Sequence, residues 1–269
     1  SEQNKNGATG VIQWLLYKYP LYDYCLHRDG EEDGCNVLVL GGATYASKFI
    51  DLAFELSQVK NCRLDITVVS KDKVGDKSNY LAPRPAMSRF FEIDGEPASD
   101  VPDSPYGKLA FTEQELKLDN EPALKKQLFE ICREKNYTYV FVSLGQEKAS
   151  KTAANACAAV FQDDETKRLI SHIVFGKETE SRNVTKNITS LQLSVFDTLD
   201  KHKEYDMLRR MAFNAHLVWG DINNIPSERA IFRSKYYFNS SLGNALSIMY
   251  KLHSIEADAG MKFDFSDPI

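Results

Sequence analysis

Two adjacent glycines, Gly41 and Gly42, stand between an apolar run and a segment with the periodicity of a helix. A turn at this place points backbone N–H groups and the positive end of the following helix at a ligand, an arrangement that holds phosphate groups. The dinucleotide pattern G-x-G-x-x-G/A falls here, with alanine in place of the middle glycine: Gly41, Gly42, Ala43, Thr44, Tyr45, Ala46. We expect a turn that binds a displaced or single phosphate. The alternative is a turn that only joins a strand to a helix.

Three polar residues, Ser70, Lys71 and Asp72, follow the second apolar run. In a dinucleotide-binding unit, an acidic residue at the end of this strand accepts a hydrogen bond from the ribose 2′-hydroxyl. Ser70 takes that position here, and Ser with Lys suits a phosphorylated ribose better than a bare one. The sequence therefore predicts NADP in preference to NAD, unless Asp72 turns into the acidic role. An ordinary polar strand end is the alternative.

Further candidates lie later in the chain. Arg84 belongs to a long polar excursion, residues 72–105, that starts where a strand of the sheet ends, so its guanidinium is predicted to clamp a phosphate or carboxylate. A solvated loop arginine is the alternative. Gly145 and Gln146 follow another apolar run and precede a small-residue helix. Right-handed connections would bring them to the same crevice as Gly41 and Gly42.

Strands and helices that alternate along the chain must position these residues. Short apolar runs predict the strands, and apolar residues at helical spacing predict the helices. Strands are expected at residues 35–40, 64–69, 108–111, 139–143 and 170–175, with 190–195 as an edge element. Helices are expected at 45–56, 121–135 and 148–161. This alternation predicts an α/β fold with a doubly wound, mostly parallel, Rossmann-like sheet.

The two ends of the chain have a different character. Residues 1–9 are expected to be loose. Residues 11–26 are aromatic and should form a short helix ending before Pro20, packed on the sheet or on a partner chain.

From about Phe196 the pattern is helical, at 203–219 and 241–253, and Arg229 and Arg233 between them could clamp an anion or lie on a solvated helix. The predicted domains are 1–34, an aromatic helix and linker; 35–196, a Rossmann-like nucleotide-binding domain; and 197–269, a small helical module.

The composition of the chain limits the kinds of partner that it is expected to bind. A net charge of −5 argues against general nucleic-acid binding, which requires Lys and Arg to neutralise phosphates. Five cysteines without a C-x-x-C pair predict neither a zinc site nor a disulfide framework, so the expected location is the cytoplasm, and no metal site is expected from the five histidines. The chain has no run of eighteen apolar residues, so no membrane segment is expected. Because it begins at Ser1 rather than Met, we consider a fragment that lacks a partner domain. A homo-oligomer is considered as a separate possibility.

Two family resemblances follow from these motifs. VLVLGGATYASKFI, LDITVVSK and YVFVSLGQ resemble the cytosolic NAD-binding domains of potassium-transport regulators, and the C-terminal AFNAHLVWGD and YYFNSSLGNALSIMYKL faintly resemble a ryanodine-receptor repeat. This implies a ligand-sensing regulatory protein whose small nucleotide ligand is NAD(P) or an adenine nucleotide. Asp72-Lys73-Val74 and Ser78-Asn79-Tyr80-Leu81 with Arg84 resemble ubiquitin-activating-type (E1-like) adenylating enzymes, which implies ATP. An NADP-linked oxidoreductase is a third hypothesis, carried by the fold alone.

Overall fold

The computed structural model describes residues 2–27, 33–42, 44–176, 178–198, 201, 204–223 and 235–260. The chain divides into two compact units, Ser1–Asp197 and Thr198–Ile269. The first unit contains both the sheet and the N-terminal helix, and the second unit is helical. Among the described helices, none is long and apolar enough to cross a membrane.

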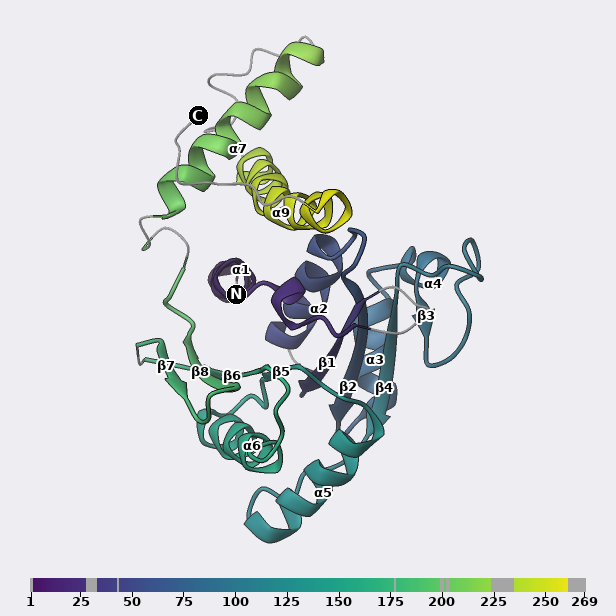
Figure 1. Ribbon diagram of the computed structural model, residues 1–269, viewed down its shortest axis with the longest axis vertical. Coiled ribbons are helices and arrows are strands. Elements are labelled where there is room, and N and C mark those ends of the chain that lie inside the picture. The colour runs from purple at the N-terminus through teal and green to yellow at the C-terminus, as the bar shows by residue number, and fades with distance from the viewer. Residues whose placement is uncertain are drawn as a thin grey trace. The chain divides into compact units, whose positions relative to one another are not determined.

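The first unit is built on an eight-stranded sheet in the order β3-β4-β2-β1-β5-β6-β8-β7 (Figure 1). Every neighbouring pair is parallel except β7 and β8, which are antiparallel. The predicted fold class is confirmed: the unit is α/β with a mostly parallel, Rossmann-like sheet. The strands are β1 Gly34–Leu40, β2 Arg63–Ser70, β3 Glu92–Ile93, β4 Gly107–Glu113, β5 Tyr139–Val142, β6 Arg168–Val174, β7 Glu180–Asn183 and β8 Ile188–Ser194.

The order of the strands reverses between β1 and β5. From β1 the chain moves outward through β2 and β4, then returns to β5 on the other side of β1 and continues through β6 and β8. Connections that leave neighbouring strands in opposite directions open a crevice at the carboxyl ends, where open α/β sheets bind ligands. The residues just after β1 and β5 are therefore the first candidates for a ligand-binding site.

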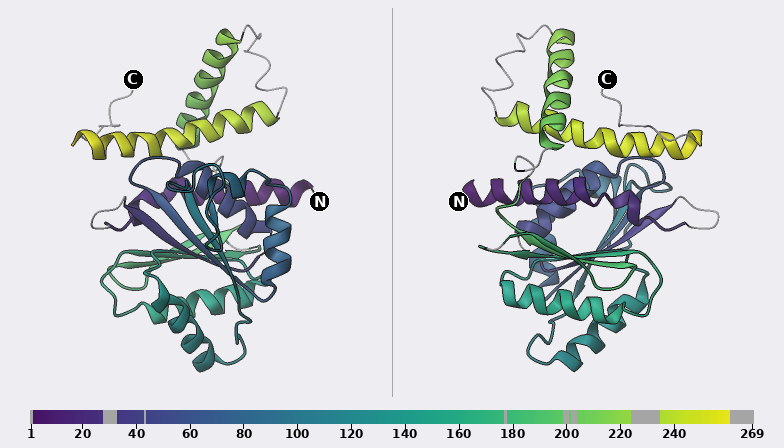
Figure 2. Two further views of the ribbon diagram at one scale, coloured as in Figure 1. Left: turned by 90° about the vertical axis from the view of Figure 1, so that its right-hand side faces the viewer. Right: turned by 60° about the vertical axis from the view of Figure 1, so that its left-hand side comes forward.

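Helices cover both faces of the sheet (Figure 2). On one face α2 Thr44–Leu56 packs beside α1 Glu2–Lys18, and on the other α5 Glu121–Glu134 packs beside α6 Glu147–Val160. Alternate residues of β1 explain this layering, because Leu38 and Leu40 belong to the core under α5 and α6. On the α2 face, Phe49 stacks on Phe141 with ring centroids 4.5 Å apart.

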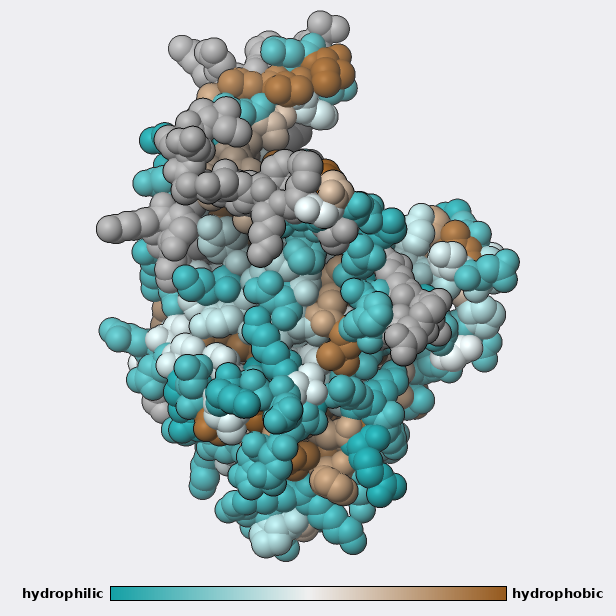
Figure 3. All heavy atoms as spheres, viewed as in Figure 1, coloured by the Kyte–Doolittle hydropathy of each residue, from teal (hydrophilic) through white to brown (hydrophobic). Residues whose placement is uncertain are grey.

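The helices over the α5 and α6 face are amphipathic. α5 buries Leu124, Leu128 and Ile131 against the sheet, at the spacing of one helix face. Over these two helices the view in Figure 3 is mostly hydrophilic, with apolar residues scattered rather than gathered in one patch. This division between a buried stripe and a polar outer surface matches the pattern from which the helices were predicted.

Three sequence expectations are wrong in detail. The part of residues 1–9 that the structure describes, 2–9, is not loose, because α1 begins at Glu2 and runs to Lys18 before the 3₁₀ helix η1 Leu21–Tyr24. The excursion at 72–105 is not a single loop but contains α3 Lys73–Leu81, α4 Met87–Phe90 and the short strand β3. The segment at 190–195 belongs to β8, which is not an edge, since β7 pairs with it on the outside.

The described residues of the second unit form two helices that pack on each other, α7 Glu204–Ile222 and α9 Lys235–Ala259. Each is longer than the helix predicted at 203–219 or 241–253. Leu208 and Ala212 of α7 are fully buried, as is Ala245 of α9. Arg229 and Arg233 lie outside the described residues, so their predicted role stays a prediction.

Candidate functional site

A cavity of about 430 Å³ lies at the carboxyl ends of β1, β2, β4 and β5. Each strand contributes the residues that immediately follow it, which is the arrangement expected at the reversal point of the sheet. Six predicted site residues line it: Gly41, Gly42, Ser70, Lys71, Gly145 and Gln146. The structure thus brings together residues that lie far apart in the chain: Gly41 and Gln146 are separated by 105 positions.

Gly41 holds the turn after β1 in a conformation that requires glycine. Its φ is +106°, and a Cβ at this position would overlap the backbone oxygen of Ser143 at the end of β5. The Gly41 N–H donates to the Val69 oxygen at 2.9 Å, and the Ser143 N–H donates to the Leu40 oxygen at 2.9 Å. Backbone contacts to both neighbouring strands therefore fix the floor of the cavity.

Gly42 allows a carboxylate to approach the turn. A Cβ on Gly42 would overlap the carboxyl carbon and both oxygens of Asp76, which lies in the first turn of α3 and lines the cavity. The carboxylate thus lies against the turn that leads into α2, close to the positive end of that helix. Asp76 fills the space above Gly42 where the sequence predicted a phosphate.

A second glycine turn follows β5. Gly145 has a φ of +78°, but a Cβ there would meet no atom within 4 Å, so only its backbone conformation favours glycine. Ser150 Oγ accepts a hydrogen bond from the Leu144 N–H at 3.0 Å, and Gln146 is the N-cap residue of α6. The carboxylate of Glu147 turns away from the cavity and accepts from the Phe175 N–H at 3.2 Å.

Thr44 and Tyr45 line an adjoining cavity of about 190 Å³, which shares Ser143 and Gly145 with the first. The Tyr45 ring meets that of Phe175 edge to face at a centroid distance of 6.2 Å, and burial raises the pKa of the Tyr45 hydroxyl. The two cavities lie on either side of the strand-end residues of β5. Ala43 lies outside the described residues.

Asp72 and Arg84 do not line either cavity. Asp72 is the N-cap of α3, where its carboxylate accepts from the Gly75 N–H at 2.9 Å. Arg84 donates to both carboxylate oxygens of Asp51 at 2.6 Å, and its guanidinium lies 4.2 Å from the centre of the Tyr80 ring. In this structure Asp72 therefore begins a helix and Arg84 ties α3 to α2.

Several lining residues were missed by the sequence reading. No helix was predicted in the polar stretch 72–105, so the position of Asp76 in the first turn of α3 went unrecognised. Gln114 and Glu115 follow β4 directly, but the predicted strand at 108–111 ended before Glu113, the last residue of the observed strand. The rule that carboxyl ends of parallel strands share an edge would have found them with the correct boundary.

The lining combines polar groups with an apolar wall. The charged groups among the described lining residues are one ammonium, Lys71, and two carboxylates, Asp76 and Glu115, while Leu116, Leu118 and Leu144 supply apolar surface. No group of three or more His, Cys, Asp or Glu residues that could hold a metal ion occurs among the described residues. Comparison of the chain with family models, curated proteins and solved structures finds no match.

Proposed function

We propose that the first unit binds a nucleotide, NAD(P) or an adenine nucleotide, and that the protein is a nucleotide-responsive sensor or regulator. The observation that carries this proposal is the cavity at the reversal point of the sheet, with a glycine turn after β1 and another after β5. Its volume of about 430 Å³ is within the range of small-molecule sites, roughly 300 to 1,000 Å³.

The lining offers a separate partner for each part of a nucleotide. Leu116, Leu118 and Leu144 present apolar surface for a flat base. Asp76 and Glu115 are hydrogen-bond acceptors for ribose hydroxyls. Because Asp76 lies over the first glycine turn, we place the phosphate groups at the second turn, where Gly145 and Gln146 lead into the positive end of α6.

A regulatory role is supported by the organisation of the chain. The nucleotide-binding unit is joined to a separate helical unit, Thr198–Ile269. Relative motion is the usual expectation for two units of one chain, and a ligand that prefers one arrangement shifts the population toward it. The arrangement of the second unit would thereby depend on whether a nucleotide is bound to the first.

The direct test is a thermal-shift panel with NAD, NADP, ATP, AMP and a cyclic nucleotide, followed by calorimetry on each ligand that raises the melting temperature. A ligand that binds only the folded state must raise it. Two variants of Ala149, a cavity residue in the first turn of α6, locate the site. Ala149→Glu places a carboxylate where we place the phosphates, whereas Ala149→Gln has nearly the same size without the charge.

We expect Ala149→Glu to weaken nucleotide binding about tenfold more than Ala149→Gln, because like charges repel in a partly enclosed site. A carboxylate in the first turn is favourable for a helix, so both variants should fold. If no nucleotide shifts the melting temperature of the parent protein, the proposed function is wrong. If a nucleotide binds equally well to both variants, its phosphates lie elsewhere.

A further inference from the structure

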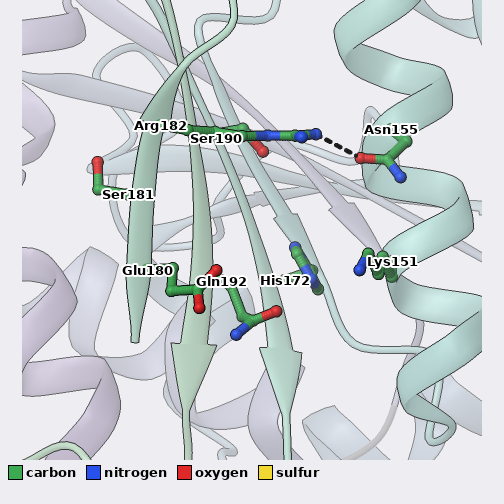
Figure 4. A pocket seen from close by; sticks show the side chains of 8 residues that line it. All are labelled: Lys151, Asn155, His172, Glu180, Ser181, Arg182, Ser190 and Gln192. Atoms are coloured by element: carbon green, nitrogen blue, oxygen red, sulfur yellow. Dashed lines mark hydrogen bonds between the residues drawn. The ribbon is translucent and has the colours of Figure 1, made fainter. Parts of the chain in front are cut away.

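A third cavity, of about 320 Å³, lies between α6 and the strands β6, β8 and β7 (Figure 4). Ser143 and Gly145, at the end of β5, line the first two cavities but not this one. All eight residues that line it have polar or charged side chains, although the cavity lies on a face of the sheet that elsewhere forms apolar core. Ile170 of β6 and Ile188 of β8 pack in that core. The change from apolar to polar side chains on one sheet face marks this cavity as a separate site.

The strand register places the polar side chains in two rows. His172 of β6 is opposite Gln192 of β8, and Gln192 is opposite Glu180 of β7. One step along the sheet face, Ser190 of β8 is opposite Arg182 of β7. Residues two apart on a strand point to the same face, so both rows face α6. The floor is buried, because His172 and Ser190 are each only 4% exposed.

The opposite wall comes from α6. Lys151 and Asn155 are four residues apart and so lie on one face of the helix. The Arg182 guanidinium reaches across from the outermost strand and donates to Asn155 Oδ1 at 2.9 Å, closing one end of the cavity. Figure 4 shows Lys151 pointing from the helix toward His172 on the sheet. Two cationic groups thus face a buried polar floor.

The charges favour an anion. Lys151 and Arg182 contribute two positive charges and Glu180 one negative charge, and no ion pair of these three is found among the described residues. Arginine presents a planar fork of five N–H groups, of which the bond to Asn155 uses one. A guanidinium fork together with an ammonium group matches the oxygen atoms of a phosphate monoester.

The remaining groups favour hydroxyls beside that anion. The Gln192 amide N–H donates to the Glu178 backbone oxygen at 2.9 Å, which leaves its carbonyl oxygen as an acceptor. Glu180, in the same row, adds a carboxylate that accepts from hydroxyl groups. The volume of about 320 Å³ is at the lower end of the range for small-molecule sites.

We propose that this cavity is a binding site for a small sugar phosphate, with the phosphate between Lys151 and Arg182 and the sugar hydroxyls toward Gln192 and Glu180. This proposal does not depend on the nucleotide site, because none of the four residues lines the first cavity. The helix α6 borders both sites, with Gln146 and Ala149 at the first and Lys151 and Asn155 at the second.

The test is calorimetric titration of the full chain with ribose 5-phosphate, and separately with inorganic phosphate and with ribose. The variants are Lys151→Met and Arg182→Gln, both at exposed positions, so that folding is preserved. Lys148→Met is the matched control, because Lys148 is an exposed lysine of the same helix that does not line the cavity. Melting temperatures of all variants establish that each is folded.

We expect ribose 5-phosphate to bind more tightly than either inorganic phosphate or ribose, and each cavity variant to weaken it about tenfold. Lys148→Met should bind like the parent. Absence of ribose 5-phosphate binding would overturn the proposal, as would binding that survives both cavity substitutions. Inorganic phosphate binding as tightly as the ester would overturn the assignment of Gln192 and Glu180 to sugar hydroxyls.

Discussion

The carboxylate of Asp76 lies against Gly42, so close that a Cβ on this glycine would overlap all three carboxyl atoms. The first glycine turn thus has an acidic neighbour from α3, whereas Lys71 lines the same cavity from the end of β2. A carboxylate favours unmodified ribose hydroxyls and an ammonium group favours a ribose phosphate. Under the proposed function, we therefore expect the choice between NAD and NADP to depend on these two residues of opposite charge.

The first prediction concerns these two residues. Asp76→Asn should raise the ratio of NADP to NAD affinity about tenfold, because it removes the negative charge that repels a 2′-phosphate. Lys71→Ala should lower the ratio by a similar factor, because it removes a charge-assisted hydrogen bond. Paired calorimetric titrations at two salt concentrations measure both. Ratios that move in the same direction in the two variants would contradict this assignment.

The second prediction separates the two glycine turns. Gly41→Ala should destabilise the protein by about 2 to 4 kcal/mol, because the added methyl group meets the Ser143 backbone at a φ of +106°. Gly145→Asn should lower the free energy of unfolding by no more than about 1 kcal/mol, since asparagine tolerates a φ of +78° and the space is open. Urea unfolding measures both values. Equal losses would show that the contact with Ser143 does not constrain the turn.

Much of this unit could be predicted from the sequence. β1 and β2 are buried on both faces, so their apolar runs indicated the parallel sheet directly. β7 was missed because all four of its residues are exposed and show no apolar alternation. α3 was missed because Tyr80 is its only buried residue, so it carries no apolar stripe.

The site was predicted less completely than the fold, for a physical reason. Strand-end residues such as Ser70 and Gly145 follow from local pattern and the common edge of parallel strands. The approach of Asp76 to Gly42 depends on how α3 packs, which no local pattern encodes. Arg84 was expected at the ligand, yet it pairs with Asp51 of α2, which lies 33 positions earlier in the chain.

The third prediction concerns the adenylating hypothesis. The arginine that carried the resemblance, Arg84, is held by Asp51 and Tyr80 and does not line the cavity. We therefore expect no acceptor-dependent exchange of pyrophosphate into ATP. The measurement uses labelled pyrophosphate with a small ubiquitin-like protein as acceptor, and clear exchange would replace the regulatory proposal by the enzymatic one.

The fourth prediction concerns the pH dependence of stability. The Asp94 side chain is only 15% exposed and accepts from Lys77 Nζ at 2.7 Å and from the Phe111 N–H at 2.6 Å. Burial alone would raise the pKa of Asp94, but these hydrogen bonds, with the nearby charge of Lys73, hold its pKa below the ordinary value of 3.8. A lowered pKa in the folded state means that Asp94 stabilises the protein above pH 3.8 and loses this effect as the pH falls through the folded-state pKa.

Asp94→Asn should therefore lower the free energy of unfolding by about 1 to 3 kcal/mol at pH 7 and by much less at pH 2 to 3. Asparagine accepts the left-handed φ of +51° at this position, so the variant removes charge without straining the backbone. Asp100→Asn is the control, since Asp100 pairs with the exposed Arg89 and its loss should have a much smaller effect. A difference between Asp94→Asn and the parent that is independent of pH would contradict the charge argument.

The last prediction concerns a thiol pair. The Cys25 thiol, at the end of η1, donates to Cys62 Sγ at 3.5 Å, just before β2. The sequence predicted no disulfide framework, and all five cysteines are reduced in this structure. Two thiols at this separation can form a disulfide when an oxidant such as diamide accepts their two hydrogen atoms. We expect diamide to link Cys25 to Cys62, whereas Cys157 should stay reduced because it is fully buried and burial raises the pKa of its thiol.

The disulfide would close a long loop that contains β1 and α2, and the chain-entropy model assigns such a loop about 3 to 4 kcal/mol of stabilisation. The oxidised protein should therefore melt at a higher temperature than the reduced one, and peptide mapping should recover the Cys25–Cys62 pair. Cys25→Ser should abolish both effects. A cross-link that maps to another pair, or an oxidised protein that melts at a lower temperature, would show that the two thiols do not reach disulfide geometry without distorting the entry to the sheet.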